Sequence, residues 1–170
     1  MNRAINFTIY FLIAAAVILK APSIMDNMGM EGKEILPNKL FQYNLKGQVN
    51  PVVFPIPGKR VVAIFWASWC APCKIELSRI NQALEKNELD KSNIFAISLD
   101  QSFEELDKAI VEKKYLFNTY LDKENNFLTK MKITATPTIV LIDEFGKIHE
   151  QTTGASINPV GKIKKFLNKE

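Results

Sequence analysis

The chain has 170 residues, a net charge of +4 and 47% hydrophobic residues. This length and composition indicate one domain with a hydrophobic core, and they exclude a low-complexity chain. The lysines are spread over both halves, so the modest positive charge is no signature of a nucleic-acid-binding protein, and we expect no nucleic-acid partner.

The N-terminus is an uncharged and largely apolar run over residues 4–19, bounded by Arg3 and Lys20. As a helix the run would be about 24 Å long, shorter than a hydrocarbon core of about 30 Å. A cleaved signal peptide and an uncleaved anchor both fit this run. No small-x-small cleavage site follows it, so we expect a membrane anchor over residues 1–20. Either alternative places the rest of the chain outside the cytoplasm.

Residues 21–38 are rich in proline and glycine, and we expect a linker there, followed by a domain over residues 39–170. The segment also holds three methionines, namely Met25, Met28 and Met30. Thioether sulfur is a soft ligand that suits Cu(I). We interpret these methionines as incidental to a spacer, because methionine fills irregular packing more often than it binds metal.

A β-hairpin is expected next, with extended segments over residues 40–45 and 49–56. Pro51 and Pro55 favour an edge position for its second strand. Residues 61–66 are continuously apolar, which is typical of a strand buried on both faces. The spacing after this strand predicts a helix over residues 71–86.

The second half alternates between strand and helix patterns. We expect a strand over residues 93–100, and then a helix to residue 114 that begins with a capping box of Ser102 and Glu105. The elements expected after it are a short extended segment over 116–121, a short helix over 125–131, strands over 138–143 and 148–153, and a helix over 157–168. This order predicts an α/β protein whose mixed central sheet is flanked by helices and has parallel central strands and an antiparallel edge.

The two cysteines of the chain, Cys70 and Cys73, lie where a buried strand gives way to a helix. A helix N-terminus favours the thiolate, the reactive form of cysteine. A structural zinc site needs four Cys or His ligands, and the chain offers only one distant histidine, so we expect no metal site. A structural disulfide in so short a loop would restrict the unfolded chain little. We therefore interpret the pair as a redox-active dithiol.

Three motifs resemble the thioredoxin superfamily and, more narrowly, its membrane-anchored TlpA/ResA-like branch. They run from Phe65 to Cys73, from Ala135 to Thr138 and from Leu141 to Ile148. The resemblance covers about residue 36 to the end. It implies a thioredoxin-like fold with an N-terminal hairpin extension, a thiol-disulfide oxidoreductase, and no cofactor beyond the redox-active Cys70-Cys73 disulfide.

The resemblance also implies roles for individual residues. Cys70 would be the exposed nucleophile and Cys73 the buried resolving thiol. Pro137 would form a cis peptide bond and face the pair. Thr136, just before it, would offer backbone groups to an extended substrate segment.

Two further residues support this expected site. Trp69 adjoins the nucleophile and would shape the surface that meets a partner, whereas Trp66 is expected to pack in the core. Pro72 separates the two cysteines. We interpret His149 as an incidental residue of an edge strand.

Ile64 stands where thioredoxin itself has a buried aspartate, so another group must handle protons. Glu76 matches an acidic position typical of the TlpA/ResA-like branch and shares a helix face with Cys73. We expect a partly buried carboxyl that tunes the thiol pKa or moves protons; a solvated helix glutamate is the alternative. Asp100 is a second candidate, although acids at strand ends often only cap or turn.

The resemblance implies partners that bear disulfides or thiols outside the cytoplasm, apocytochrome c among them, and a membrane thiol donor that recharges the pair. Thr138 stands where the haem-biogenesis branch often has an acid, which counts against a dedicated cytochrome c role. Two alternatives stay open. One is a disulfide-donating oxidase on the same fold, and the other is a copper carrier that uses Cys70, Cys73 and the three methionines. A peroxidase would need a peroxidatic cysteine without an adjacent partner, and the chain has none.

Overall fold

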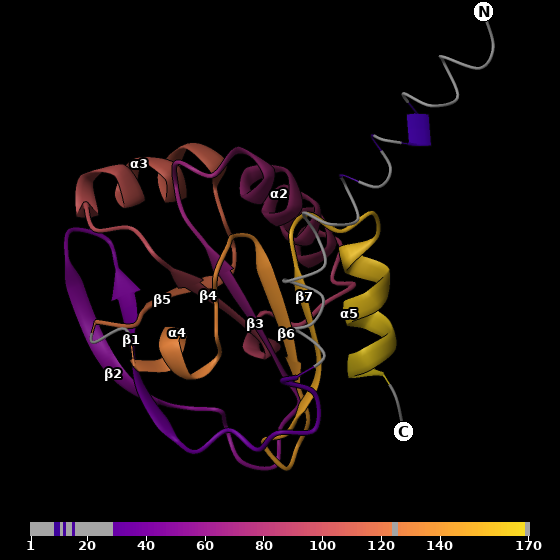
Figure 1. The fold of residues 1–170 in the computed structure, drawn as a ribbon. Coiled ribbons are helices and arrows are strands. Elements are labelled where there is room, and N and C mark those ends of the chain that lie inside the picture. Colours follow the sequence, from indigo (N-terminus) through magenta and orange to yellow (C-terminus); the bar gives the residue numbers. More distant parts are fainter. Residues whose placement is uncertain (1–8, 11, 13–14, 16–28, 124–125, 169–170) are drawn as a thin grey trace, which may run out of the picture.

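The computed structural model describes residues 9–10, 12, 15, 29–123 and 126–168. These residues form a seven-stranded sheet with helices on both faces (Figure 1). The strands lie in the order β2-β1-β5-β4-β3-β6-β7. Their bounds are β1 Asn38–Asn44, β2 Gln48–Phe54, β3 Val61–Trp66, β4 Ile94–Ser98, β5 Asn118–Leu121, β6 Thr138–Ile142 and β7 Ile148–Thr153. The helices are α2 Ala71–Glu85, α3 Phe103–Lys113, α4 Asn126–Lys130 and α5 Pro159–Leu167, with a 3-10 turn at Lys91–Asn93.

The predicted α/β architecture with a mixed sheet is confirmed. Strands β3, β4 and β5 are parallel to one another, and β6 and β7 continue the sheet in antiparallel pairing. The structure adds a second antiparallel edge that the sequence did not predict, because β1 pairs with β5 at Phe41 and Leu121. The N-terminal hairpin therefore extends the central sheet. Its second strand, β2, lies at the outer edge, where Pro51 is tolerated.

Strand β3 is fully buried, as its apolar run predicts, and it divides the core into two layers. Ile64 and Trp66 belong to the layer beneath α2, α3 and α5, which also contains both cysteines. Ala63 and Phe65 belong to the layer on the opposite face, together with residues of α4. Figure 1 shows α4 in front of the sheet and α3 and α2 across its upper side. Successive side chains of a strand point to opposite faces of the sheet, so Ile64 and Trp66 share one face. Both cysteines pack in the core layer on that face.

The hairpin is fastened to α3 through Asp107. The Tyr43 hydroxyl donates a hydrogen bond to Asp107 Oδ1 at 2.8 Å, and the Lys46 backbone N–H donates to Asp107 Oδ2 at 3.1 Å. The rings of Tyr43 and Phe103 stack with their centroids 5.4 Å apart. These contacts hold the turn between β1 and β2 against the first turns of α3.

Residues 30–35, within the expected linker, contact the sheet through two buried side chains and through backbone hydrogen bonds. Met30 is 4% exposed and Ile35 is 8% exposed. The Gly32 backbone N–H donates to the Ile148 carbonyl at 2.8 Å, at the start of edge strand β7. The glycines and prolines of this segment predicted a spacer, but two of its apolar side chains complete the core layer around α4.

The expected anchor over residues 1–20 falls almost entirely outside the described residues. Among the residues that are described, no helix has the length and apolar character needed to cross a membrane. The anchor and the division of the chain into anchor, linker and domain therefore stay predictions.

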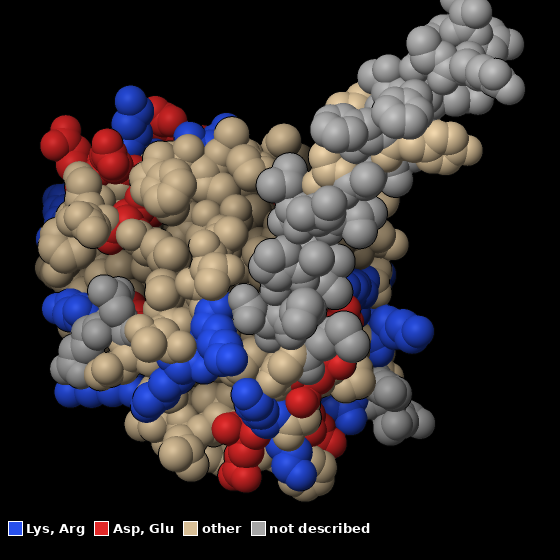
Figure 2. Space-filling model, in the orientation of Figure 1, with Lys and Arg blue, Asp and Glu red and all other residues tan. Residues whose placement is uncertain are grey.

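Charges of both signs are mixed over the face seen in Figure 2, and uncharged surface covers its upper centre. Two ion pairs, Arg60 with Glu144 and Lys162 with Glu150, each have an N–O distance of 2.7 Å. Their side chains are all 23% to 36% exposed, so we expect these pairs to contribute little to stability.

We expect Met30→Ala to lower the free energy of unfolding by about 2–3 kcal/mol, because truncating a buried methionine leaves a cavity. Leu36→Ala is the matched control, since Leu36 is 69% exposed. That control should change the free energy by less than about 0.5 kcal/mol. Urea titrations of the two variants and the wild type provide the comparison. Equally small effects in both variants would show that residues 30–35 lie outside the cooperative unit.

Candidate active site

Cys70 and Cys73 form a disulfide at the N-terminus of α2. Cys70 is the N-cap residue, and its Sγ accepts a hydrogen bond from the Cys73 backbone N–H at 3.3 Å. Pro72 lies in the first turn, where its missing N–H costs no helical hydrogen bond. Cys70 is 5% exposed, which is less than the exposed nucleophile that the resemblance implied, and Cys73 is completely buried, so Cys70 is the more accessible residue of the two.

Exposed apolar side chains lie close to the pair in the sequence. Trp69 is 67% exposed and Ile75, five residues after Cys70, is 58% exposed. Trp66 is fully buried, as expected, and its ring meets that of Tyr115 edge-on at 5.7 Å. The two tryptophans therefore differ as predicted, one packing in the core and one facing solvent.

The loop before β6 lies beside the turn that leads to Cys70. Phe65 of β3 pairs with Thr138 of β6, and continuing this register places Pro137 opposite Trp66. The Thr136-Pro137 peptide bond is cis, as the resemblance implied. Pro137 is buried, whereas Thr136 is partly exposed. The Thr138 hydroxyl donates to the Ala135 carbonyl at 2.7 Å, within the same loop.

Glu76 is only 1% exposed, which rules out the alternative of a solvated helix glutamate. Its Oε1 accepts a hydrogen bond from the Ser156 backbone N–H at 3.1 Å. Its Oε2 is buried and has no hydrogen-bond partner among the described residues. Burial raises the pKa of Glu76, and the Ser156 N–H and the positive charges of Arg79 and Lys162 offset part of this effect.

Asp100 lies just after β4 and holds the turn that precedes Cys70. Its carboxylate accepts hydrogen bonds from the Ser68 backbone N–H and hydroxyl and from the Ser98 hydroxyl. These contacts agree with a capping role rather than with a proton carrier. His149 is exposed in β7, and its ring stacks on that of Phe166 at 5.2 Å.

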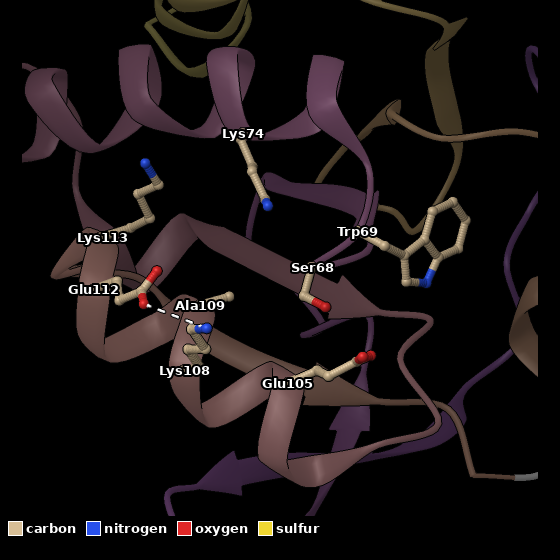
Figure 3. A pocket seen from close by; sticks show the side chains of 8 residues that line it. All are labelled: Ser68, Trp69, Lys74, Glu105, Lys108, Ala109, Glu112 and Lys113. Carbon is tan, nitrogen blue, oxygen red and sulfur yellow. Dashed lines mark ion pairs between the residues drawn. The ribbon is translucent and has the colours of Figure 1, made fainter.

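A hollow of about 310 Å³ lies beside the pair, between the start of α2 and one side of α3 (Figure 3). Ser68, Trp69 and Lys74 line it from the strand-to-helix turn and from α2. The remaining lining residues come from α3, namely Glu105, Lys108, Ala109, Glu112 and Lys113. Figure 3 shows Lys74 extending from α2 toward α3. The sequence analysis missed this hollow, because it depends on how closely α3 approaches α2.

The copper-carrier alternative loses one of its ligands. Met30 belongs to the core layer around α4, on the face of the sheet opposite Cys70 and Cys73. Met25 and Met28 lie outside the described residues. Among the residues that are described, no group of three or more His, Cys, Asp or Glu side chains could hold a metal ion.

The sequence pattern of the AhpC/TSA family matches residues 44–151. The chain belongs to the AhpC/TSA family. Among its curated relatives, sporulation thiol-disulfide oxidoreductase A of Bacillus subtilis is 24% identical over 127 residues, which cover 73% of this chain and 76% of the relative. The thiol-disulfide oxidoreductase ResA of Oceanobacillus iheyensis is 33% identical over 113 residues, which cover 66% of this chain but only 58% of that relative.

Solved structures confirm the thioredoxin-like fold. StoA from Bacillus subtilis matches with a TM-score of 0.63 and 23% identity, covering 77% of this chain and 97% of that one. The thioredoxin domain of a thiol-disulfide oxidoreductase from Bacteroides vulgatus matches with a TM-score of 0.66 and 27% identity, covering 81% and 98%. The names of the relatives and the disulfide at the start of α2 agree with the predicted class of enzyme, the thioredoxin-like thiol-disulfide oxidoreductases.

Proposed function

We propose that this protein reduces disulfide bonds of partner proteins outside the cytoplasm, with Cys70 as the attacking thiol and Cys73 as the resolving thiol. The observation that supports these roles is the unequal exposure of the two cysteines at one helix N-terminus. Cys70 is 5% exposed and Cys73 is completely buried. A partner disulfide can therefore meet Cys70 first, and Cys73 can act only within the protein.

The reaction begins with the reduced pair. The Cys70 thiolate attacks one sulfur of the partner disulfide, forms a mixed disulfide and releases the other partner sulfur as a thiolate. Cys73 then loses its proton and attacks the Cys70 sulfur. This step forms the Cys70-Cys73 disulfide and releases the second partner thiol, so two electrons have passed from the pair to the partner.

Two features of α2 favour the thiolate of Cys70. The helix N-terminus supplies partial positive charge, and the Cys73 backbone N–H points at the Cys70 sulfur at 3.3 Å. A lower thiol pKa increases the thiolate fraction and so favours attack at neutral pH.

Glu76 is the group that we propose to accept the proton of Cys73. It lies one helical turn beyond Cys73 on the same helix, and burial raises the pKa of its carboxyl group. A carboxylate whose pKa is raised is a stronger base than an exposed glutamate, so it is better suited to accept a proton. Its unpartnered Oε2 is the atom available for this transfer.

The partner and the electron donor are proposed by chemical class. The partner is an extracytoplasmic protein with a disulfide, and apocytochrome c belongs to this class. A membrane thiol donor would return the pair to its reduced state after each cycle. The predicted anchor over residues 1–20 would keep the protein at the membrane surface near that donor.

The reduction potential of the Cys70-Cys73 couple tests the direction of transfer. The protein used should retain Met30 and Ile35, because both belong to the core. Reference values are about −270 mV for thioredoxin and about −120 mV for the strong oxidant DsbA. We expect a value near or below the first. A value near the second would mean that the protein donates disulfides, which is the alternative function on the same fold.

A further inference from the structure

We infer that Asp100 is a positioning residue for Cys70. It holds the turn that joins β3 to α2, and this turn fixes the direction of the Cys70 side chain. This inference rests on the proposed function, in which Cys70 attacks the partner. Among the described residues, Asp100 forms no hydrogen bond with either cysteine, and it follows β4 rather than β3.

Both oxygens of the Asp100 carboxylate are engaged by the same small group of donors. Oδ1 accepts from the Ser68 backbone N–H at 3.0 Å and from the Ser68 hydroxyl at 2.6 Å. Oδ2 accepts from the same N–H at 2.9 Å and from the Ser98 hydroxyl at 2.7 Å. Ser68 is 7% exposed and Ser98 is 5% exposed, so water competes little for these bonds.

These bonds join two strands at the point where the site begins. Ser98 ends β4, and Ser68 lies two residues before Cys70 in the turn after β3. Within that turn the Cys70 backbone N–H donates to the Ala67 carbonyl at 3.1 Å. Hydrogen bonds to a carboxylate are about twice as strong as neutral ones, so the bonds to Asp100 restrain this turn more strongly than the backbone bond from Cys70 to Ala67 does.

The direction of the Cys70 side chain determines whether its sulfur can accept the hydrogen bond from the Cys73 backbone N–H at the N-terminus of α2. If the turn loosens, the sulfur spends less time near the Cys73 N–H and the thiolate loses stabilisation. Loosening therefore raises the thiol pKa of Cys70. Removal of the Asp100 negative charge alone would have the opposite effect, because a nearby like charge disfavours the thiolate.

Because a loosened turn would raise the thiol pKa of Cys70 and a lost charge would lower it, the variant Asp100→Asn distinguishes the two roles of Asp100. The amide keeps the size of the side chain, but its NH₂ group cannot accept from Ser68 or Ser98. The charged residues of α2 closest in sequence to Cys70, Lys74 and Glu76, stay in place. We expect the thiol pKa of Cys70 to rise even though a negative charge has been removed.

Asp107→Asn is the matched control. Asp107 is also half-buried. It accepts from one hydroxyl and one backbone N–H, whereas Asp100 accepts from two hydroxyls and one backbone N–H, and Asp107 holds the hairpin rather than the turn before Cys70. Both variants should be less stable than the wild type. Only Asp100→Asn should change the reactivity of Cys70.

The experiment uses the full-length, fully reduced protein. The thiol pKa of Cys70 is read from thiolate ultraviolet absorbance against pH, and the rate of attack is measured on a small-molecule disulfide at neutral pH. We expect the rate to fall about two- to threefold in Asp100→Asn, because greater nucleophilicity offsets part of the lost thiolate fraction. Asp107→Asn should match the wild type in both measurements. If Asp100→Asn folds poorly, Ser98→Ala removes one of the tethers and should shift both readouts in the same direction by less.

A fall in the thiol pKa, or no change, would overturn the inference, because Asp100 would then act only through its charge or as a turn cap. Equal changes in both aspartate variants would also overturn it, since general destabilisation would explain them. These readouts need only a titrating Cys70 thiol. A wild-type protein that fails to reduce protein disulfides would therefore refute the proposed function without affecting the result for Asp100.

Discussion

Replacing Cys73 with serine is expected to leave Cys70 joined to partner proteins through stable mixed disulfides. The serine hydroxyl cannot attack the Cys70 sulfur as the thiol does, so the second step of the exchange stops. Cys70 keeps its place at the N-terminus of α2, where the backbone N–H of residue 73 still points at its sulfur. Adducts of higher mass should appear on non-reducing gels of cells that express the variant, and they should disappear on reduction.

Cys70→Ser provides the matched control for this trap. It removes the attacking sulfur, so it should form no adducts and lose disulfide reductase activity to the level of the uncatalysed reaction. If Cys73→Ser traps no partner while the wild type binds stoichiometric Cu(I), the proposed exchange is wrong and the copper carrier gains support. Mass spectrometry of the trapped adducts would also identify the partner.

Glu76→Gln is expected to make the protein more stable at neutral pH and slower as a reductase. Burial raises the pKa of Glu76 above its ordinary value of 4.5. The folded state therefore binds this proton more tightly than the unfolded chain does. The stability associated with it is fully present below pH 4.5 and is lost as the pH rises through the pKa of the folded state.

Glutamine carries no charge to desolvate, so the variant should gain on the order of 1 kcal/mol at pH 7 and nothing at pH 4. It also cannot accept a proton, so reduction of a protein disulfide should slow by about tenfold or more. Urea titrations at the two pH values and rates against pH provide the measurements. Glu104→Gln, at an exposed position of α3, should change the free energy of unfolding by less than about 0.5 kcal/mol. Unchanged stability and rate in Glu76→Gln would contradict both the buried charge and the proton transfer.

Local patterns in the sequence were sufficient for the order of elements and for the reactive pair. The uninterrupted apolar run over residues 61–66 has one stable solution, a strand covered on both faces, and it became β3. The Ser102 hydroxyl accepts from the Glu105 N–H at 3.4 Å, as the capping box predicts. Spacing alone placed the cysteines at a helix start. Each of these signals operates within a few residues of chain, so each can be read from the sequence.

Contacts between distant residues were decided only in the folded chain. The pairing of β1 with β5 joins residues about 80 apart. Met30 and Ile35 lie in a segment whose glycines and prolines predict a spacer, yet both side chains belong to a core layer built largely from distant strands. The sequence alone therefore did not predict that the hairpin joins the central sheet or that Met30 and Ile35 are buried.

The sequence by itself placed Cys70 and Cys73 at a helix N-terminus and Glu76 on the same helix, which are the residues of the proposed mechanism. Only the tertiary structure decided their environment. Glu76 is buried because the loop at Ser156, 80 residues away, closes over it, and Asp100 reaches the turn before Cys70 from 32 residues away in the chain. The reason is physical: helix and strand periodicity arise between neighbours, whereas desolvation and hydrogen bonding of a side chain depend on whatever the fold packs against it.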